Sequence, residues 1–203
     1  MDILVACEYS GIVREAFVRR GHRAMSCDIL PTELPGEHYQ GDVRDVLYSD
    51  WDMVIGFPPC TRLSSVGARY WPKWRADGSQ QEAIDFFMLF ANHPASKVVV
   101  ENPAGAMSKA WRKADQYVNP WQFGHPWKKR TGLWLKGVPP LVPTNVVVPQ
   151  GHWVDGGTMS KGGRTGRSEG AYAGASAKSN GQRAKERAKT FQGLADAMAA
   201  QWG

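Results

Sequence analysis

The chain opens with Asp2-Ile3-Leu4-Val5-Ala6-Cys7-Glu8-Tyr9-Ser10-Gly11, and this stretch decides the fold that we expect. Its first six residues form a short apolar run typical of a buried strand, and a turn with a single glycine follows. Gly21 is placed to end the next segment as a helix. In that segment apolar residues recur at helical spacing and polar residues occupy the other face: Ile12, Val13, Ala16 and Phe17 against Arg14, Glu15, Arg19 and Arg20. The sequence therefore predicts a strand, a tight turn and a helix in succession.

Strands and helices alternate along the rest of the chain. Apolar segments predict further strands over residues 22–27, 52–57, 97–101 and 132–136. A capping-box pattern at 79–82 predicts the start of a second helix, and Phe191, Leu194, Ala195 and Met198 predict a last one. Residues 31–41 and 58–80 are expected to be loops. This alternation predicts an α/β protein with a doubly wound, mainly parallel sheet.

Composition narrows the class of protein. A chain of 203 residues suits one domain over residues 1–203, and 42% hydrophobic with 22% charged residues is typical of a globular protein. Three cysteines without CxxC spacing predict neither a disulfide framework nor a metal site. No apolar run is long enough to span a bilayer, and no basic segment precedes the first apolar run as in a signal peptide. We therefore expect a cytoplasmic protein with no membrane and no metal.

The formal net charge of +6 favours a polyanionic partner, because each neutralised phosphate releases counterions. Basic residues outnumber acidic ones most clearly over residues 128–189. Gly, Ser, Ala and basic residues dominate 151–181, which predicts a flexible loop rather than a second domain. A solvated surface is the alternative interpretation of such a charge excess, and a nucleic acid is the partner that we expect.

One half of a candidate site follows the first strand. In open α/β sheets, ligands bind beyond the carboxyl ends of the strands. Asp28 lies 17 positions after Gly11, at the end of the second strand, where a carboxylate can accept the ribose hydroxyls of a nucleoside. Because Gly11 is the only glycine of the turn, S-adenosylmethionine fits better than a dinucleotide. An ordinary strand-helix unit with a solvated Asp28 is the alternative.

The other half is a reactive thiol with a carboxyl group. Cys60 follows a strand and two prolines that fix the backbone, and it opens a polar loop near Arg62, where a cation favours the thiolate. Glu101 ends a later strand at the same edge, where a carboxyl could hold a proton or hydrogen-bond a base. The alternatives are a buried structural cysteine, our interpretation of Cys7 and Cys27, and a merely solvated Glu101.

The order of these motifs resembles the DNA (cytosine-5-)-methyltransferase family, in the short form carried by phages and prophages. The resemblance covers about residues 2–136 and implies a Rossmann-like class I S-adenosylmethionine-dependent methyltransferase fold. It also implies DNA methylation in a bacterial or phage-infected cytoplasm, as in restriction-modification. The matching motifs are Cys7–Gly11, Asp28, Gly41-Asp42-Val43, Gly56-Phe57-Pro58-Pro59-Cys60, Glu101-Asn102-Pro103 and Lys128-Lys129-Arg130.

The resemblance implies roles for individual residues. Cys60 would add to C6 of cytosine, Glu101 would contact N3 and the exocyclic amine, and Arg130 would help to bind the target base. Arg62, Ser64, Lys128 and Lys129 would contact DNA, and the loop 61–75 would close over a flipped base. S-adenosylmethionine would bind Asp28 through its ribose and Asp42 near its adenine, within a site made of Cys7, Glu8, Tyr9, Ser10, Gly11, Asp28, Ile29, Asp42, Val43 and Pro58. The last helix is expected beside the first strand.

Three features depart from the family pattern. The cofactor turn is reduced to Ser10-Gly11, the basic motif is blurred, and residues 144–182 offer only a Gly/Ser/basic loop in place of a target-recognition domain. Sequence specificity would then be weak, come from this loop, or need a separate subunit.

Two alternatives stay open. Folate-dependent enzymes that modify pyrimidine nucleotides at C5, such as thymidylate synthase, share the Pro-Pro-Cys turn but carry His where this chain has Thr61. A non-catalytic DNA-binding decoy would keep the fold without the reaction.

Overall fold

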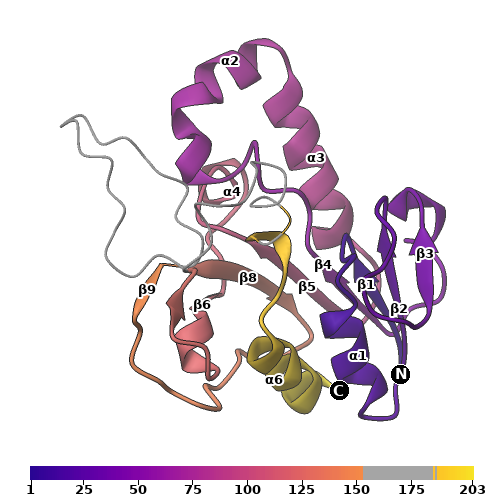
Figure 1. The fold of residues 1–203 in the computed structure, drawn as a ribbon. Coiled ribbons are helices and arrows are strands. Elements are labelled where there is room, and N and C mark those ends of the chain that lie inside the picture. Colours follow the sequence, from indigo (N-terminus) through magenta and orange to yellow (C-terminus); the bar gives the residue numbers. More distant parts are fainter. Residues whose placement is uncertain (153–184, 186) are drawn as a thin grey trace.

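A seven-stranded mixed sheet forms the centre of the computed structural model, which describes residues 1–152, 185 and 187–203 (Figure 1). The strand order is β3-β2-β1-β4-β5-β8-β6. These strands are β1 (Asp2–Ala6), β2 (Arg23–Asp28), β3 (His38–Gln40), β4 (Met53–Gly56), β5 (Lys97–Asn102), β6 (Gln116–Val118) and β8 (Thr131–Lys136). A separate parallel pair joins β7 (Trp127–Lys128) to β9 (Gly151–His152), and the 3-10 helix η3 (Pro120–Gln122) precedes β7.

The direction of the strands places their ends. β1 pairs in parallel with β2 on one side and β4 on the other, and β4 pairs in parallel with β5, so the carboxyl ends of these four strands share one edge. β8 runs antiparallel to β5, with Glu101 opposite Leu133 and Asn102 opposite Gly132. The start of β8 therefore lies at that same edge. The predicted α/β architecture and mainly parallel sheet are confirmed, and the antiparallel β8 is an addition to them.

Helices cover both faces of the sheet (Figure 1). On one face, α1 (Ile12–Val18) and α6 (Gln192–Trp202) share a core with Ile3 and Val5 of β1. On the other, α3 (Ser79–Ala91), η1 (Val43–Asp45) and α4 (Met107–Ala110) contribute to a core with Leu4 and Ala6. Burial on both faces explains why β1 is apolar throughout rather than alternating. The expected position of the last helix, beside the first strand, is confirmed.

Two predicted loops contain regular structure. Residues 58–80 include η2 (Ser65–Tyr70) and α2 (Trp71–Ala76), with a proline in the first turn of α2, and β3 lies within 31–41. The predicted capping box at 79–82 was wrong. The helix cap is Gly78, with a φ of 80°, and the Asp77 carboxylate accepts the Ser79 amide at 3.0 Å instead. Local patterning missed these short elements because they depend on distant parts of the fold: α2 packs against α3, and β3 pairs with β2.

The described residues contain neither a candidate membrane span nor a candidate metal cluster. No helix there has both the length and the apolar character needed to cross a membrane. Nor does that part of the chain hold three or more His, Cys, Asp or Glu side chains grouped to bind a metal. Most of the predicted Gly/Ser/basic loop at 144–182 lies outside the described residues.

Arg14 corrects the prediction of a polar outer face on α1, because its side chain is completely buried. The guanidinium donates to the Ser26 hydroxyl at 3.0 Å and to the carbonyl oxygens of Leu34 and Pro35 at 2.8 and 2.9 Å. A Cβ added at Gly36 would stand 2.7 Å from the guanidinium, so only glycine fits there. Arg14 thereby holds the loop after β2 in place through hydrogen bonds to its buried carbonyl groups.

We expect Arg14→Ala to lower the free energy of unfolding by about 3 kcal/mol, because buried carbonyl groups lose a charged donor. Urea denaturation followed by circular dichroism measures this change. Arg20→Ala is the matched control, since Arg20 is exposed just beyond the same helix, and it should change stability little. Equal effects of the two substitutions would contradict the role given to Arg14.

Candidate functional site

The turn after β1 holds a strained residue and a buried carboxyl group. Cys7 adopts a φ of 58°, a left-handed conformation that is rare outside glycine and that concentrates at functional sites. Glu8 is buried, and its Oε1 accepts from the Ser10 hydroxyl and from the Ile12 amide at 3.1 Å. Its Oε2 has no hydrogen-bond partner in the described part of the chain. Burial raises the pKa of the Glu8 carboxyl, and a cationic donor brought by a ligand to this second oxygen would stabilise the carboxylate form.

The end of β2 places an acid and an apolar surface next to this turn. Asp28 is half-buried and accepts the Leu30 amide at 2.9 Å, while burial raises the pKa of its carboxyl. Ile29 beside it is 75% exposed, so its apolar side chain is open to a ligand. The charge of Asp28 also acts on the Cys7 thiol and contributes to raising its pKa, after burial. Asp28 and the turn after β1 therefore form one local site.

Asp42 and Val43 are placed differently from Asp28. The exposed Asp42 carboxylate accepts the Arg44 amide at 3.0 Å and pairs with the Arg44 guanidinium at 2.8 Å. The amide hydrogen bond is the main reason why the pKa of Asp42 is lowered. Val43 is buried in the core that contains Leu4. Tyr9, also buried, donates its hydroxyl to the Lys185 carbonyl at 2.7 Å.

The Pro58-Pro59-Cys60 turn is tied to the end of β5. The buried Asn102 amide donates to the Pro58 carbonyl at 2.8 Å. The Cys60 carbonyl accepts from Leu63 and Ser64 amides at 3.0 and 2.8 Å, which closes the turn. Gly105 then packs against it so tightly that an added Cβ would lie 1.9 Å from the Leu63 carbonyl oxygen. The loops after β4 and β5 thus form one packed unit that presents Cys60.

Three charged groups act on the Cys60 thiol. Desolvation comes first and Glu101 second in raising its pKa, whereas Lys129 and Arg187 act to lower it. The residue is exposed as a whole, yet surrounding protein atoms crowd the thiol enough for desolvation to dominate. Lys129 donates to the Lys189 carbonyl at 3.1 Å, and burial lowers the pKa of its ammonium. The resting site is therefore a neutral thiol beside a carboxyl and an ammonium group.

The side chains around Glu101 differ from those that the motifs suggested. The Thr131 hydroxyl donates to Glu101 Oε1, and Lys129, predicted to contact DNA, lies close enough to act on both Glu101 and Cys60. Arg130, predicted to bind the target base, instead stacks over the ring of Tyr117 at 4.0 Å. Thr131 and Arg187 were missed, and Asn102 was named only as part of the Glu101-Asn102-Pro103 motif, without a role of its own. The antiparallel pairing of β8 with β5 brings Thr131 to Glu101, and no pattern in the sequence reveals that pairing.

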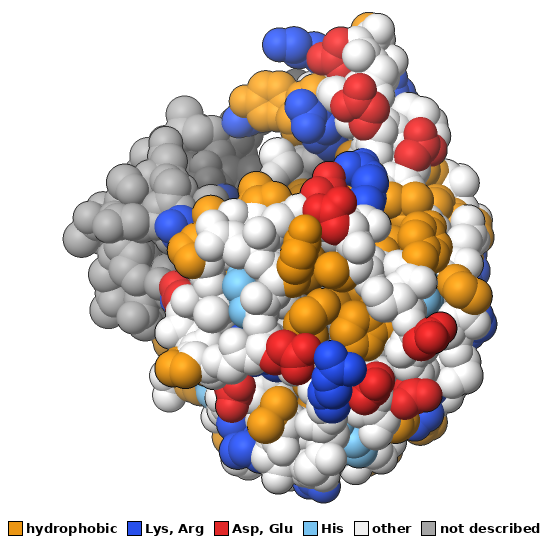
Figure 2. Space-filling model, turned by 90° about the vertical axis from the view of Figure 1, so that its right-hand side faces the viewer, with side chains coloured by type: hydrophobic (Ala, Val, Ile, Leu, Met, Phe, Trp, Pro, Cys, Tyr) orange, Lys and Arg blue, Asp and Glu red, His pale blue; other side chains and the backbone are white. Residues whose placement is uncertain are grey.

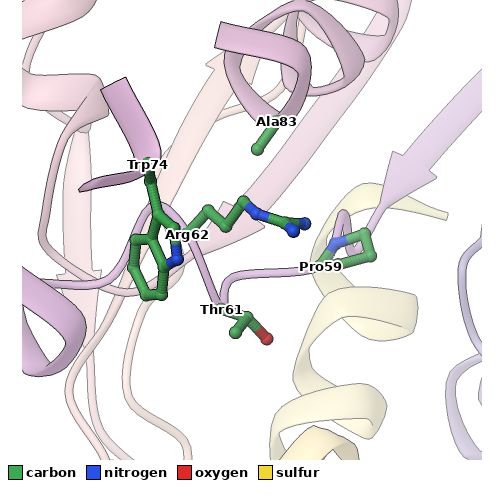
Figure 3. Close-up of a pocket in the computed structure, with 5 residues that line it drawn as sticks. All are labelled: Pro59, Thr61, Arg62, Trp74 and Ala83. Carbon is green, nitrogen blue, oxygen red and sulfur yellow. The ribbon is translucent and has the colours of Figure 1, made fainter. Parts of the chain in front are cut away.

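The residues predicted to bind DNA on the Cys60 loop fall into two kinds. Ser64 is half-buried and caps η2 by accepting the Val66 amide at 3.3 Å. Arg62 is exposed and lines a hollow of about 250 Å³ beside the Cys60 turn (Figure 3). Lys128 is exposed on β7. The other lining residues of the hollow are Pro59, Thr61, Trp74 and Ala83.

The face shown in Figure 2 has mixed charge. Acidic and basic side chains lie intermixed around an apolar patch near its centre. A nucleic acid backbone favours a surface of one positive sign rather than an interspersed one. This face therefore lacks the electrostatic character of a polyanion-binding surface.

Comparison with known proteins gives little sequence similarity. No protein-family model matches this chain, and no curated protein matches it in sequence. Among solved structures, it is similar to one described as the Entamoeba histolytica methyltransferase EhMeth, with 11% sequence identity and a TM-score of 0.49. The match covers 72% of this chain and 57% of that chain, so this chain spans less than two thirds of that structure's length. The function proposed below rests on the residues of the site itself.

The three cysteines should differ in their reaction with iodoacetamide. Cys60 is exposed and should be alkylated first, but slowly at neutral pH because its pKa is raised. Glu101→Gln removes a like charge, lowers the thiol pKa and should speed alkylation severalfold. Lys129→Met removes a stabilising cation and should slow it. Mass spectrometry of timed samples across a pH series measures these rates.

Cys27 serves as the internal control, because it is buried and its pKa is raised to about 11. It should stay unmodified until the protein is unfolded. Equal alkylation rates in Glu101→Gln, Lys129→Met and the unchanged protein would show that these charges do not act on Cys60.

Proposed function

We propose that this protein transfers a methyl group from S-adenosylmethionine to C5 of cytosine in DNA, through a covalent adduct with Cys60. The observation that carries the proposal is the convergence of Cys60, Glu101 and Lys129 at one edge of the sheet. The same edge holds the turn after β1 with its buried Glu8 and the nearby Asp28. We further propose that the sheet, with its antiparallel β8, is a Rossmann-like class I methyltransferase fold.

The turn after β1 fits S-adenosylmethionine in its donor and acceptor groups. Glu8 Oε2 is a buried acceptor without a partner in the described structure, and the ammonium group of the cofactor would satisfy it. Asp28 would accept the ribose hydroxyls, and the exposed Ile29 would cover one face of the adenine. The Asp42 carboxylate already pairs with Arg44, so it would have to accept the adenine amine and the Arg44 guanidinium at the same time. The bound cofactor would supply an electrophilic methyl group.

The residues near Cys60 account for activation of the cytosine ring. The Cys60 thiol would give its proton to the Glu101 carboxylate as Sγ forms its bond to C6. The π electrons of the C5–C6 bond then make C5 nucleophilic. Glu101, whose Oε1 accepts from the Thr131 hydroxyl, would share the proton taken from Cys60 with N3 and so stabilise the charge that reaches the ring. Once C5 carries the methyl group, water takes the C5 proton and the electrons of the C5–H bond restore the C5–C6 double bond. The S–C6 bond breaks in the same step, and its electrons return to sulfur.

Lys129 has two tasks in this scheme. Its ammonium favours the Cys60 thiolate, and it offsets the negative charge of Glu101 in the same site. Because both effects are electrostatic and act in a crowded site, they are stronger than they would be in water. Lys129 thus takes the position for which the motif had suggested Arg130. Sequence specificity would come from another subunit or from the loop at 144–182.

One observation favours a non-catalytic DNA-binding protein as the second candidate. The pKa of Cys60 is raised in the described structure, so the thiol is neutral at rest. A catalytic cysteine more often carries a lowered pKa. The two candidates differ in whether the thiol forms a bond with cytosine when DNA and the methyl donor are present.

We expect a covalent complex between the protein and DNA that contains 5-fluorocytosine, because fluorine at C5 cannot leave as a proton and the adduct is trapped. Denaturing gel electrophoresis in the presence of S-adenosylmethionine detects this complex. Cys60→Ala should abolish it and reduce methyl transfer by more than about 1000-fold. Cys27→Ala, a control at a buried cysteine, should retain both. Binding of DNA without adduct formation would favour the non-catalytic candidate.

Two substitutions separate the contacts to the cofactor. Asp28→Asn and Glu8→Gln should each weaken S-adenosylmethionine binding by about tenfold, the cost of one charge-assisted hydrogen bond. 5′-Methylthioadenosine keeps the ribose but lacks the ammonium group, so Asp28→Asn should weaken its binding whereas Glu8→Gln should not. Isothermal titration calorimetry measures these affinities, with the exposed Asp50→Asn as control. Unchanged affinities in both variants would exclude this site.

A further inference from the structure

A column of aromatic and cationic side chains runs over η2 and α2, the segment that follows Cys60. The rings of Tyr70 and Trp74 lie 5.4 Å apart between their centroids, and the Arg69 guanidinium lies 4.6 Å over the ring of Tyr70. Tyr70 is 45% exposed. We call these three residues the aromatic column. The family resemblance implies only that the loop 61–75 closes over a flipped base, and it gives these three side chains no individual role.

The aromatic column adjoins the hollow beside Cys60. Figure 3 shows Arg62 extending through this hollow, with Trp74 on one side and Pro59 on the other. Thr61 lies below and Ala83 above in the same view. Pro59 and Thr61 are the chain neighbours of Cys60. A group bound in the hollow would therefore lie next to whatever reacts with the Cys60 thiol.

The walls of the hollow are held in place before any ligand binds. The buried Gln80 side chain donates to the Arg62 carbonyl at 3.0 Å and accepts from the Arg75 guanidinium at 2.9 Å. Trp74 packs over Gly67, where an added Cβ would lie 3.0 Å from the indole ring and 3.1 Å from the Thr61 carbonyl oxygen. Such preorganisation lowers the entropic cost of binding.

Indole and guanidinium groups together favour a nucleobase. Each base has two π faces that stack on aromatic rings and guanidinium planes without regard to its identity. Within a duplex, both faces of a base are covered by its neighbours, so only an unpaired base can use such a wall. The same segment carries four cations, which suit a phosphate backbone. Its single acidic residue is Asp77, whose carboxylate accepts a hydrogen bond from the Ser79 hydroxyl. Those cations are Arg62, Arg69, Lys73 and Arg75.

We infer that the hollow between the Cys60 turn and α2 binds an unpaired base adjacent to the target cytosine, and that single-stranded DNA is the preferred substrate. This inference rests on the proposed reaction for the identity of the target, and on Trp74 and Arg62 for the form of the strand. It gives the segment after Cys60 the role of a recognition element.

Fluorescence anisotropy with end-labelled oligonucleotides of about 12 nucleotides tests the inference, since single-strand sites span a comparable length. Single-stranded DNA with one cytosine should bind at least tenfold more tightly than its duplex at the same ionic strength. Trp74→Ala should weaken single-strand binding about tenfold and leave duplex binding unchanged. Trp74→Phe should restore most of the loss, and Trp111→Ala, at another partly exposed tryptophan, should cause none.

A second arm locates the bound base. Oligonucleotides with an abasic site on one or the other side of the cytosine should lose affinity for the unchanged protein on one side only. Trp74→Ala should show no additional loss with that oligonucleotide, because the same contact is already missing. Circular dichroism confirms that each variant is folded.

Three results would overturn the inference. The first is that the duplex binds as tightly as the single strand or more tightly, and the second is that Trp74→Ala weakens binding of both DNA forms equally. The third is that RNA of the same sequence binds more tightly than single-stranded DNA. The 5-fluorocytosine adduct separates this failure from that of the proposed function. An adduct formed only with duplex DNA would support methyl transfer and refute the single-strand preference. Binding of single strands that depends on Trp74 but gives no adduct would support the single-strand preference and refute methyl transfer.

Discussion

The hydrogen bond from the Asn102 amide to the Pro58 carbonyl joins the ends of two neighbouring strands, and the candidate site depends on it. β4 and β5 are already in parallel register, with Gly56 opposite Val100. Parallel pairing alone brings their ends to one edge, but it leaves the loops beyond them free to diverge. The Asn102 side chain removes that freedom, because its donor is buried and has to be satisfied. Cys60 and Glu101 therefore keep a fixed relation.

Charge balance at this edge explains how a reactive thiol can be kept at rest. Glu101 and desolvation oppose ionisation of Cys60, whereas Lys129 and Arg187 favour it. A neutral thiol is a poor nucleophile and is slow to oxidise. A substrate that engages Glu101 would remove part of the opposing charge effect and shift the balance toward the thiolate. The resting state and the reactive state then differ by one local interaction.

Local patterns in the sequence were sufficient for the elements near the N-terminus. The strand, the turn and the helix over residues 2–18 depend on nearest neighbours and helical spacing, and they occur as predicted. The burial of Arg14 was beyond such patterns, because its partners Leu34 and Pro35 come from a loop that folds back over the helix. Likewise, the partners of Glu101 depend on the pairing of β8, a strand whose direction no periodicity reveals.

The candidate site also combines residues whose role can be read only in three dimensions. Asp28 was predictable because it ends a clear strand after a clear turn. The position of Lys129 beside Cys60 was not predictable for a simple reason: three basic residues in a row point in different directions as the chain enters β8. Arg130 then stacks on Tyr117, and Lys129 turns toward Cys60. The sequence shows the charge and the order of these basic residues, but it does not show the direction in which each side chain points.

The contact between Tyr9 and Lys185 has a consequence for the timing of biosynthesis. Residues 176 positions apart meet at this hydrogen bond, and α6 likewise packs against α1. A ribosome releases the N-terminal strand-turn-helix unit long before either partner has been synthesised. During synthesis the turn after β1 therefore lacks its contact with Lys185, and α1 lacks its contact with α6, as is usual for folds that rely on distant contacts. The candidate site is complete only after Lys185 and Arg187 have been synthesised. A chain that ends before them would contain Cys60 but lack both residues.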